Sequence, residues 1–536
     1  MNRAALVGLA AATAAVGCTD WKAARAEYCR NHSAQEDCLD AGPATGSDAG
    51  RQVGFGTPLV LSWARLSGSL GSDYATDLRL DPVGARLLVA GRVGGLADLG
   101  DGRVLAVSHT AGFVALYATD GGLSDGMALD CASTNDSYPS FIEHADFIDG
   151  GIAAAGTCVG GSPKVHLLDG GGFPAPDGGP AGEVDPFVAV WGPAGLRYRA
   201  FGVTAPDYAY SSRFVGLAYD GVALFAAANP TFGSVWLGLP SPSEPVVARV
   251  DPGDLSGQEW LSYGCGPGVT DVTVEAVAAG AGGRVLAAFT SGPTVGAPCR
   301  FLVDGGNPTG ISSGTINPGK HRYLADVTTR YSANRTDLAS VPGLPDGGTS
   351  ESRVRLVAFG ADTAFVAGEF VGQLYASPNN TFTQTRSTLF VARVKTAIGQ
   401  IDALNVFVPA PGARAWVGGL ALDLSKPSSP TVWITGGLEG ALLQADGGSL
   451  LEAAGGETDA FLLSLKGNAL TPDRGMTFGG PECDTEGRAL AVDGADLYLA
   501  GSARPATAAG ASCSFAGQSL AATGGDDVLL AKLRAP

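Results

Sequence analysis

The chain has 536 residues, of which 45% are hydrophobic and 80 are glycine, and its formal net charge is −18. This charge argues against nucleic acid and anionic lipid as partners, because an acidic surface repels both. The apolar share excludes a disordered chain, and the many glycines, which follow no collagen period, indicate a fold rich in short turns.

The first 17 residues have the pattern of an export signal. A positively charged start precedes an apolar run at residues 4–16, which is too short to span a bilayer. The run leads into AVGC at residues 15–18, which resembles a bacterial lipobox. We therefore predict a lipoprotein-type signal peptide at residues 1–17, with a lipid on Cys18 that anchors the protein in the outer membrane or at the cell surface. The alternative is simple secretion, into the periplasm or the medium.

Residues 18–57 are predicted to form a tether that holds a globular domain, residues 58–536, away from the membrane. Cys29 and Cys38 are placed to close a small loop near its start. Residues 41–56 are rich in Gly, Ser, Asp and Pro, a composition typical of a flexible linker.

A hairpin-like stretch recurs seven times along the globular domain. The clearest copy, LAVDGADLYLAG at residues 490–501, has two apolar strands around an Asp-Gly turn, and we expect its second strand to end at Gly501. The seven copies begin at Leu78, Phe147, Leu217, Val277, Leu356, Leu420 and Leu490. A period of 60 to 79 residues is typical of a propeller or a solenoid.

Each hairpin is followed by further apolar stretches. A third strand has a small or polar residue at its third or fourth place, as in FVALY at residues 113–117 and FVARV at residues 390–394. A fourth strand comes after a turn, most plainly at residues 198–202 and 260–264. Four strands in about 70 residues, repeated seven times, predict an all-β fold, a seven-bladed β-propeller of four-stranded blades.

An N-terminal strand is predicted to complete the last blade. The seventh unit has no fourth strand, because the sequence ends three residues after Leu533. Residues 59–66, in contrast, form an apolar stretch ahead of the first hairpin. Pairing this stretch with residues 528–533 would close the propeller and remove two exposed sheet edges, which otherwise favour aggregation.

The repeat resembles the bacterial SBBP-type β-propeller repeat, whose units contain an aspartate, an FVAKL strand, then AVD, a glycine turn and VYVTG. The match is carried by DDVLLAKL at residues 526–533 and by AVD at residues 491–493 through to Gly501. The resemblance covers roughly residues 58–534. It implies a β-propeller and leaves the activity open, because one fold hosts many functions.

Eight cysteines besides Cys18 are predicted to form disulfides, because an even number in an exported chain favours pairing. When the cysteines are compared with the repeat pattern, three pairs of them each flank one hairpin at equivalent positions. The predicted bonds, in sequence order, are Cys29–Cys38, Cys131–Cys158, Cys265–Cys299 and Cys483–Cys513. Buried free thiols are the alternative, and a zinc site is disfavoured because no Cys-x-x-Cys spacing occurs.

No catalytic residue, cofactor or metal site is predicted. The G-x-S-x-G stretch at residues 310–314 lacks the strand-to-helix context of a nucleophile elbow. The five histidines show no metal-ligand spacing, and the tryptophans of the strand patterns are interpreted as packing residues rather than sugar platforms. These tryptophans are Trp191, Trp236, Trp260 and Trp433. Asp-Gly-Gly triplets are interpreted as turns, with bound calcium as the alternative; they begin at Asp120, Asp149, Asp169, Asp177, Asp304, Asp346 and Asp446.

The leading hypothesis is a non-enzymatic binding or protein-interaction scaffold at the cell envelope, with a protein or polysaccharide partner. Long inserts between strands are the candidate binding loops. They span residues 160–183, 229–244, 292–320, 342–352 and 376–387. The alternatives are a carbohydrate-active enzyme, a lyase or glycosidase with its site in the central channel, and a calcium-stabilised adhesin.

Overall fold

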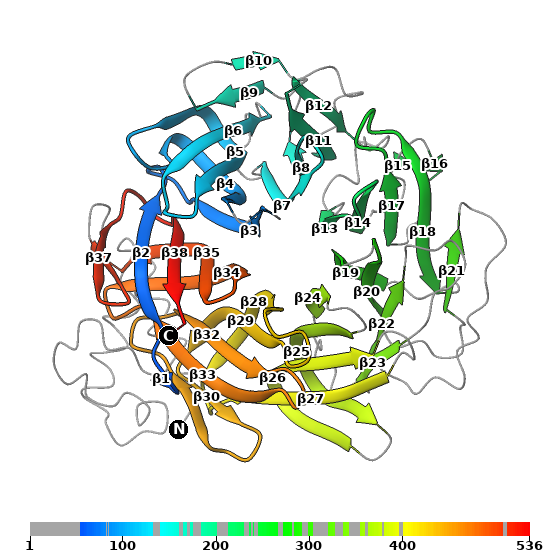
Figure 1. The fold of residues 1–536 in the computed structure, drawn as a ribbon, viewed down its shortest axis with the longest axis vertical. Helices are drawn as coiled ribbons and strands as arrows, with labels where there is room; N and C mark the ends of the chain where they lie inside the picture. The colour runs from blue at the N-terminus through cyan, green and yellow to red at the C-terminus, as the bar shows by residue number, and fades with distance from the viewer. Residues whose placement is uncertain are drawn as a thin grey trace, which may run out of the picture. The chain divides into compact units, whose positions relative to one another are not determined.

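The computed structural model describes residues 54–535 with internal gaps, the longest of which are residues 175–183, 201–212, 304–319, 327–335 and 342–353. This part of the chain is all-β, and its strands pair in antiparallel sheets (Figure 1). Cys18, Cys29 and Cys38 lie outside the described residues, as does the G-x-S-x-G stretch. Within the described part, no helix has the length and apolar character needed to cross a membrane.

All seven predicted hairpins are present as pairs of adjacent strands. They are β3 (Tyr74–Leu80) with β4 (Arg86–Asp98), β7 (Phe141–Ile148) with β8 (Gly151–Val159), β13 (Arg213–Tyr219) with β14 (Leu224–Asn229), β19 (Val272–Ala279) with β20 (Val285–Ser291), β24 (Val354–Phe359) with β25 (Thr363–Ser377), β28 (Arg414–Asp423) with β29 (Thr431–Glu439), and β34 (Cys483–Asp493) with β35 (Asp496–Pro505). We call the units that begin with these hairpins repeats 1 to 7.

A third and a fourth strand complete each of the first six repeats. They are β5 (Val104–Ala118) and β6 (Leu123–Asp130), β11 (Val184–Gly192) and β12 (Gly195–Ala200), β17 (Val246–Val250) and β18 (Gly257–Cys265), β22 (Lys320–Asp326) and β23 (Thr336–Val341), β26 (Asn380–Lys395) and β27 (Gln400–Pro409), and β32 (Asp459–Lys466) and β33 (Thr471–Phe478). In each repeat the four strands pair in chain order. A succession of four-stranded antiparallel units is propeller-like, as the repeat pattern predicted.

Repeat 7 takes its fourth strand from the N-terminal part of the chain. Its third strand, β38 (Asp527–Arg534), pairs with β2 (Val60–Ser67), and the register places Leu61 opposite Leu533. This is the strand pairing predicted from the sequence. Immediately before it, β1 (Gly54–Phe55) pairs with β33 of repeat 6, so these two residues, which the prediction placed in the flexible linker, belong to a sheet.

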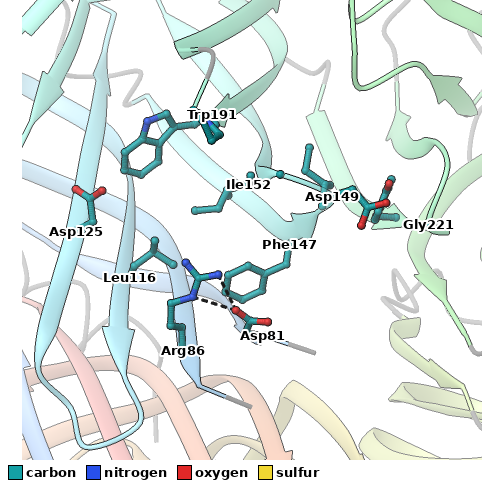
Figure 2. Close-up of a pocket in the computed structure, with 15 residues that line it drawn as sticks. Asp81, Arg86, Leu116, Asp125, Phe147, Asp149, Ile152, Trp191 and Gly221 are labelled. Atoms are coloured by element: carbon teal, nitrogen blue, oxygen red, sulfur yellow. Dashed lines mark hydrogen bonds and ion pairs between the residues drawn. The ribbon is translucent and has the colours of Figure 1, made fainter. Parts of the chain in front are cut away.

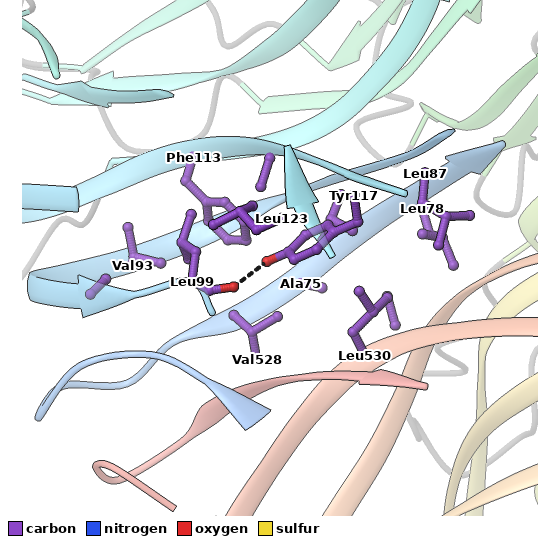
Figure 3. Packing of buried hydrophobic residues seen from close by; sticks show 14 of the residues in the cluster. Ala75, Leu78, Leu87, Val93, Leu99, Phe113, Tyr117, Leu123, Val528 and Leu530 are labelled. Carbon is purple, nitrogen blue, oxygen red and sulfur yellow. Dashed lines mark hydrogen bonds between the residues drawn. The ribbon is translucent and has the colours of Figure 1, made fainter. Parts of the chain in front are cut away.

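The hydrophobic core lies between neighbouring repeats. Among the described residues, seven clusters of buried apolar side chains each combine two repeats, and one of them combines repeat 7 with repeat 1. In that cluster Phe113 and Tyr117 of β5 lie close to Val528 of β38, and the Tyr117 hydroxyl donates a 2.9 Å hydrogen bond to the Leu99 carbonyl (Figure 3). Burying each such side chain contributes ~1.5–3 kcal/mol, so packing between sheets dominates the stability.

A β-bulge interrupts the first strand at the same place in every repeat. The register shifts lie between Ala75 and Asp77, Ile142 and His144, Phe214 and Gly216, Val274 and Ala276, Val354 and Leu356, Val417 and Gly419, and Gly487 and Ala489. The bulge brings the two backbones close together, and at Gly501 an added Cβ would lie 1.9 Å from the Glu486 carbonyl oxygen. The prediction that Gly501 ends its strand is wrong, because β35 continues to Pro505.

Two of the predicted binding inserts contribute strands to neighbouring sheets. In the insert at 160–183, β9 (Lys164–Leu167) pairs with β6 of repeat 1 and with β10 (Gly172–Pro174). In the insert at 292–320, β21 (Cys299–Val303) pairs with β18 of repeat 3. Each therefore covers the outer edge of the preceding repeat, which leaves fewer backbone groups unpaired.

The remaining inserts differ from one another. The insert at 229–244 contains a small hairpin, β15 (Val235–Trp236) with β16 (Leu239–Pro240), and 376–387 belongs to the long hairpin of β25 and β26. The insert at 342–352 lies outside the described residues. The role of all five inserts in binding stays a prediction.

Two of the predicted disulfides are present, and they occupy different places in their repeats. Cys131 and Cys158 join the end of β6 in repeat 1 to β8 in repeat 2, with an S–S distance of 2.09 Å. Cys483 and Cys513 join the start of β34 to β36 (Ser512–Phe515), which forms a hairpin with β37 (Gln518–Ala521). Both bonds flank a single hairpin as predicted, but their positions are not equivalent, because Cys131 follows the fourth strand of repeat 1 whereas Cys483 begins the first strand of repeat 7.

The backbone also brings the third predicted pair together. Cys265 at the end of β18 lies directly opposite Cys299 at the start of β21 in the strand register. The bond between them stays a prediction, as does the bond between Cys29 and Cys38.

Candidate functional site

A pocket of about 810 Å³ opens at the ends of repeats 1, 2 and 3 (Figure 2). This volume is in the range of small-molecule sites, roughly 300–1,000 Å³. Turn residues and strand ends form its walls. They are Asp81, Arg86, Leu116, Asp125, residues 147–152, residues 191–193, Tyr219 and Gly221.

The pocket lies where first strands turn into second strands and third strands into fourth strands. The turn between β7 and β8 and the end of β11 contribute its central part. Because successive antiparallel strands reverse direction, the inserts between second and third strands emerge at the opposite ends of the sheets. The face predicted from these long inserts is therefore not the face that carries this pocket.

Arg86 lies in the pocket between a carboxylate and an aromatic ring. Its Nε and Nη2 atoms donate hydrogen bonds of 3.0 and 2.7 Å to Oδ2 of Asp81. Its guanidinium carbon lies 5.5 Å from the ring centroid of Phe147. Asp81 itself is buried, and its Oδ1 accepts a 3.1 Å hydrogen bond from the backbone N–H of Val83. These contacts join the first hairpin of repeat 1 to that of repeat 2.

Trp191 contributes a half-buried indole from the end of β11 (Figure 2). It packs on the cluster between repeats 1 and 2, as predicted, and it also lines the pocket, which was not predicted. Tyr219 approaches from repeat 3, and burial raises its pKa, with the charge of Asp149 adding to the effect. No local sequence signal marks the pocket residues as a group, because they are spread over three repeats.

A second group of polar residues lies on the first strands of repeats 1 and 2. Nη2 of Arg79 is 3.3 Å and Nδ1 of His144 is 3.4 Å from Oδ2 of Asp77. Burial would raise the pKa of Asp77, but the charge of Arg79 and the hydrogen bond from His144 hold it below its usual value. Burial raises the pKa of Asp146, the neighbouring carboxyl on β7, to about 6. The two carboxyl groups thus differ in proton affinity within one cluster.

Histidines that looked isolated in the sequence meet a carboxylate in the fold. Nδ1 of His109 and Nε2 of His166 each lie 3.6 Å from an oxygen of Asp130, which is 1% exposed. His109 belongs to β5 and His166 to β9, the strand that the insert of repeat 2 adds to this sheet. Among the described residues, no group of three or more His, Cys, Asp or Glu side chains is arranged to hold a metal ion.

The Asp-Gly-Gly triplets that are described with their contacts form turns, as predicted. Oδ1 of Asp120 accepts a 3.0 Å hydrogen bond from the backbone N–H of Gly122, and Asp446 accepts the same bond from Gly448. Such a bond to the residue two positions later is typical of an Asx-turn. The triplets at 169, 177, 304 and 346 lie outside the described residues, and a calcium ion in these loops stays a prediction.

An aspartate closes a tight loop at the start of the third strand in repeat 6. Asp459 is completely buried, and its Oδ2 accepts a 3.1 Å hydrogen bond from the backbone N–H of Gly455. Among the described residues, no donor lies in good hydrogen-bond geometry to its Oδ1. Burial raises the pKa of Asp459 to about 7, although the hydrogen bonds from Gly455 and Ala454 oppose the shift. Asp527 holds the same place in repeat 7 and accepts a 2.7 Å bond from the Thr523 N–H.

We expect the free energy of unfolding of the wild type to fall as pH rises, and we expect Asp459→Asn to abolish this fall. In the unfolded chain this carboxyl has a pKa of about 4, and in the folded chain its pKa is about 7. The protonated carboxyl is therefore favoured by folding, and its contribution disappears as pH rises through about 7. Between about pH 4 and pH 8, the free energy of unfolding of the variant, measured with urea, should rise by roughly 3 kcal/mol relative to that of the wild type.

The matched control for this prediction is Asp446→Asn, which changes an exposed turn carboxylate of the same repeat. It should follow the wild-type pH profile. A difference between Asp459→Asn and wild type that stays constant with pH would contradict the assignment.

The sheet topology and the packing of neighbouring repeats place the chain among β-propeller-like proteins. No family model matches it, and no curated protein sequence matches it. Among solved structures it is similar to one described as the propeller of Dos1, with a TM-score of 0.37 and 9% identity over 88% of this chain and 95% of that chain. At this level of similarity the likeness carries no argument about function. The resemblance to SBBP-type repeats stays a prediction.

Proposed function

We propose that the described repeats form a seven-bladed β-propeller closed by β2. The proposal is supported by the seven apolar clusters, one for each pair of neighbours, including repeat 7 with repeat 1. It is supported further by contacts between successive first strands, with β34 of repeat 7 against β3 of repeat 1. Pairing of β2 with β38 leaves repeat 7 with four strands like the others.

We propose that this propeller is a non-enzymatic binding scaffold of the cell envelope. The observation that carries the proposal is the pocket, where side chains from three repeats, with aromatic rings from two of them, line one cavity of about 810 Å³. Aromatic side chains supply large contact areas and are enriched at binding sites. Lipid attachment at Cys18 and an outer-membrane location complete the proposal; both rest on the lipobox-like sequence AVGC.

A crosslinked pull-down tests the scaffold function. The full-length chain, extracted in detergent from its own cells, is compared with a Phe147→Ala/Trp191→Ala variant that removes two walls of the pocket. We expect the variant to recover at least ~tenfold less of a stoichiometric partner, because aromatic residues of this kind dominate binding energy. The control is Leu424→Ala, which truncates an exposed side chain in repeat 6. Equal recovery by all chains would refute binding at the pocket.

The polar cluster on β3 and β7 supports a second candidate, a carbohydrate-active enzyme with its site in the central channel. Asp77 and Asp146 have pKa values moved in opposite directions, and general acid–base catalysis uses such pairs. Recovery of polysaccharide in place of protein, shortened on incubation, would favour this candidate. No observation in the described residues favours the calcium-stabilised adhesin.

A further inference from the structure

The charged groups of the pocket leave it with an excess of negative charge. Three carboxylates, Asp81, Asp125 and Asp149, face one guanidinium, that of Arg86. Asp81 is paired with Arg86 at 2.7 Å, so these two charges offset each other. Asp125 and Asp149 are exposed, and in the part of the chain that the structure describes neither forms an ion pair with lysine or arginine. The pocket therefore presents two carboxylates that have no cationic side chain as a partner among the described residues.

Arg86 shows that this pocket can bind a cationic group. It is a guanidinium held between a buried carboxylate, Asp81, and the face of Phe147 at 5.5 Å. A cation over an aromatic face is attracted by the negative charge density of the ring, and the attraction grows where water is displaced. The protein thus builds, within this pocket, one complete site for an organic cation and fills it with its own side chain.

A carboxylate and an aromatic ring also lie near each other elsewhere in the pocket, where no described lysine or arginine side chain lies between them. Figure 2 shows the Trp191 indole and the Asp125 carboxylate beside the same hollow, with Asp149 across from them on the turn after β7. Tyr219 lies near Asp149, whose charge contributes to the raised pKa of this tyrosine. Aromatic surfaces and carboxylates that form no ion pair with a described lysine or arginine therefore occur together on two sides of the cavity.

We propose that the pocket binds an organic cation, in which a primary ammonium or guanidinium group is joined to an apolar body. The charge would pair with Asp125 or Asp149, and the body would lie against Trp191. A cavity of about 810 Å³ exceeds what a bare ammonium group needs, which favours a larger ligand such as a basic side chain of a peptide or an amino sugar. The net charge of −18 would draw such a ligand toward the protein. This inference rests on the proposed binding function of the same pocket.

Calorimetric titration of the full chain with small probes tests the proposal. The cationic probes are N-acetyl-lysine methylamide, its arginine equivalent and glucosamine. Their neutral matches are N-acetyl-norleucine methylamide and N-acetylglucosamine. We expect the cationic probes to bind more tightly than the neutral ones, with an affinity that falls as salt is raised, because exposed charges are screened. The peptide and sugar arms distinguish the two sources of the charge.

Substitution of the carboxylates provides the second arm. We expect the Asp125→Asn/Asp149→Asn variant to bind the cationic probes at least ~tenfold more weakly, because it removes both charges and keeps the shape of the side chains. The matched control is Asp493→Asn, at the corresponding exposed turn of repeat 7, which should bind as the wild type does. Thermal melting of each variant checks that the fold is retained.

Three results would overturn the proposal: equal binding of neutral and cationic probes, unchanged binding by the double variant, or no binding of any probe. If the partner in the pull-down is still lost with Phe147→Ala/Trp191→Ala, the pocket binds a ligand of another class and only the cation proposal fails. If that partner is retained, the proposed function fails as well.

Discussion

A chain that lacks residues 1–67 is expected not to fold, whereas a chain that lacks only residues 1–53 is expected to melt as the full-length protein does. The longer deletion removes β2, whose backbone pairs with β38 from Val60 to Ser67. It also removes Leu59 and Ala64 from the cluster between repeats 6 and 7. The shorter deletion keeps both.

The expected effect is large because β38 is buried on both sides. Residues 527–531 are inaccessible, and Leu533 is 0% exposed. Without β2 this strand becomes an edge with unpaired backbone groups next to an open apolar surface. The lost burial and pairing amount to roughly 5 kcal/mol or more, comparable with the whole stability of a typical domain.

The measurement is thermal melting with detection by circular dichroism, together with the yield of non-aggregated protein. A synthetic peptide of residues 54–68, added during refolding, should restore the transition of the longer deletion, and a peptide of scrambled sequence should not. An unchanged melting midpoint in the chain that lacks residues 1–67 would contradict closure by β2.

Gly436→Ala is expected to lower the free energy of unfolding by at least ~4 kcal/mol. Gly436 lies in β29 opposite the bulge of β28, and an added Cβ would be 1.7 Å from the Trp416 carbonyl oxygen and 2.9 Å from Cε1 of Phe461. The neighbouring strand cannot easily retreat, because β28 packs on β34, where a Cβ at Gly418 would lie 2.0 Å from the Gly487 carbonyl oxygen. Relief of the overlap requires movement of packed backbone, which is costly in a dense core.

The matched control is Gly480→Ala, because nothing lies within 4 Å of an added Cβ there and no positive φ is required. Its unfolding free energy should stay within ~0.5 kcal/mol of the wild type. Urea unfolding of both variants measures the difference, and similar values for the two would rule out the close backbone approach as the reason for the glycine. The place equivalent to Gly436 is occupied by Ala228 in repeat 3 and by Phe289 in repeat 4. Glycine is therefore required at this place only in the repeats in which the two strands approach most closely.

Local sequence was sufficient to predict the strands of the seven four-stranded units, but not the short strands that the inserts add, such as β9, β10 and β21. The apolar alternation around turns such as that at Asp493 depends on neighbours within a few residues, so it can be read directly from the chain. The period then predicted the third and fourth strands, including the weak copy that became β22. Even the long-range pairing of β2 with β38 was predicted, because one unit lacked a strand and another stretch had no partner.

Residue chemistry was less informative where its role depends on a partner in another repeat. Gly501 was interpreted as a strand end because its freedom of backbone conformation was considered without the oxygen of Glu486 that faces it. Cys131 was assigned to one hairpin, although its bond to Cys158 crosses between repeats. For Gly501 the facing backbone oxygen could not be read from the sequence, whereas for Cys131 the partner was predicted correctly and only its place in another repeat was not.

The sequence by itself determined the strand order, the seven hairpins and the N-terminal strand of repeat 7, because these follow from periodic burial along the chain. Only the tertiary structure decided which side chains share a pocket. Arg86, Phe147, Trp191 and Tyr219 are brought together by the packing of three repeats, and no spacing along the chain encodes that proximity. The physical reason is that strand formation depends on local alternation, whereas a site at the end of several sheets depends on how those sheets pack.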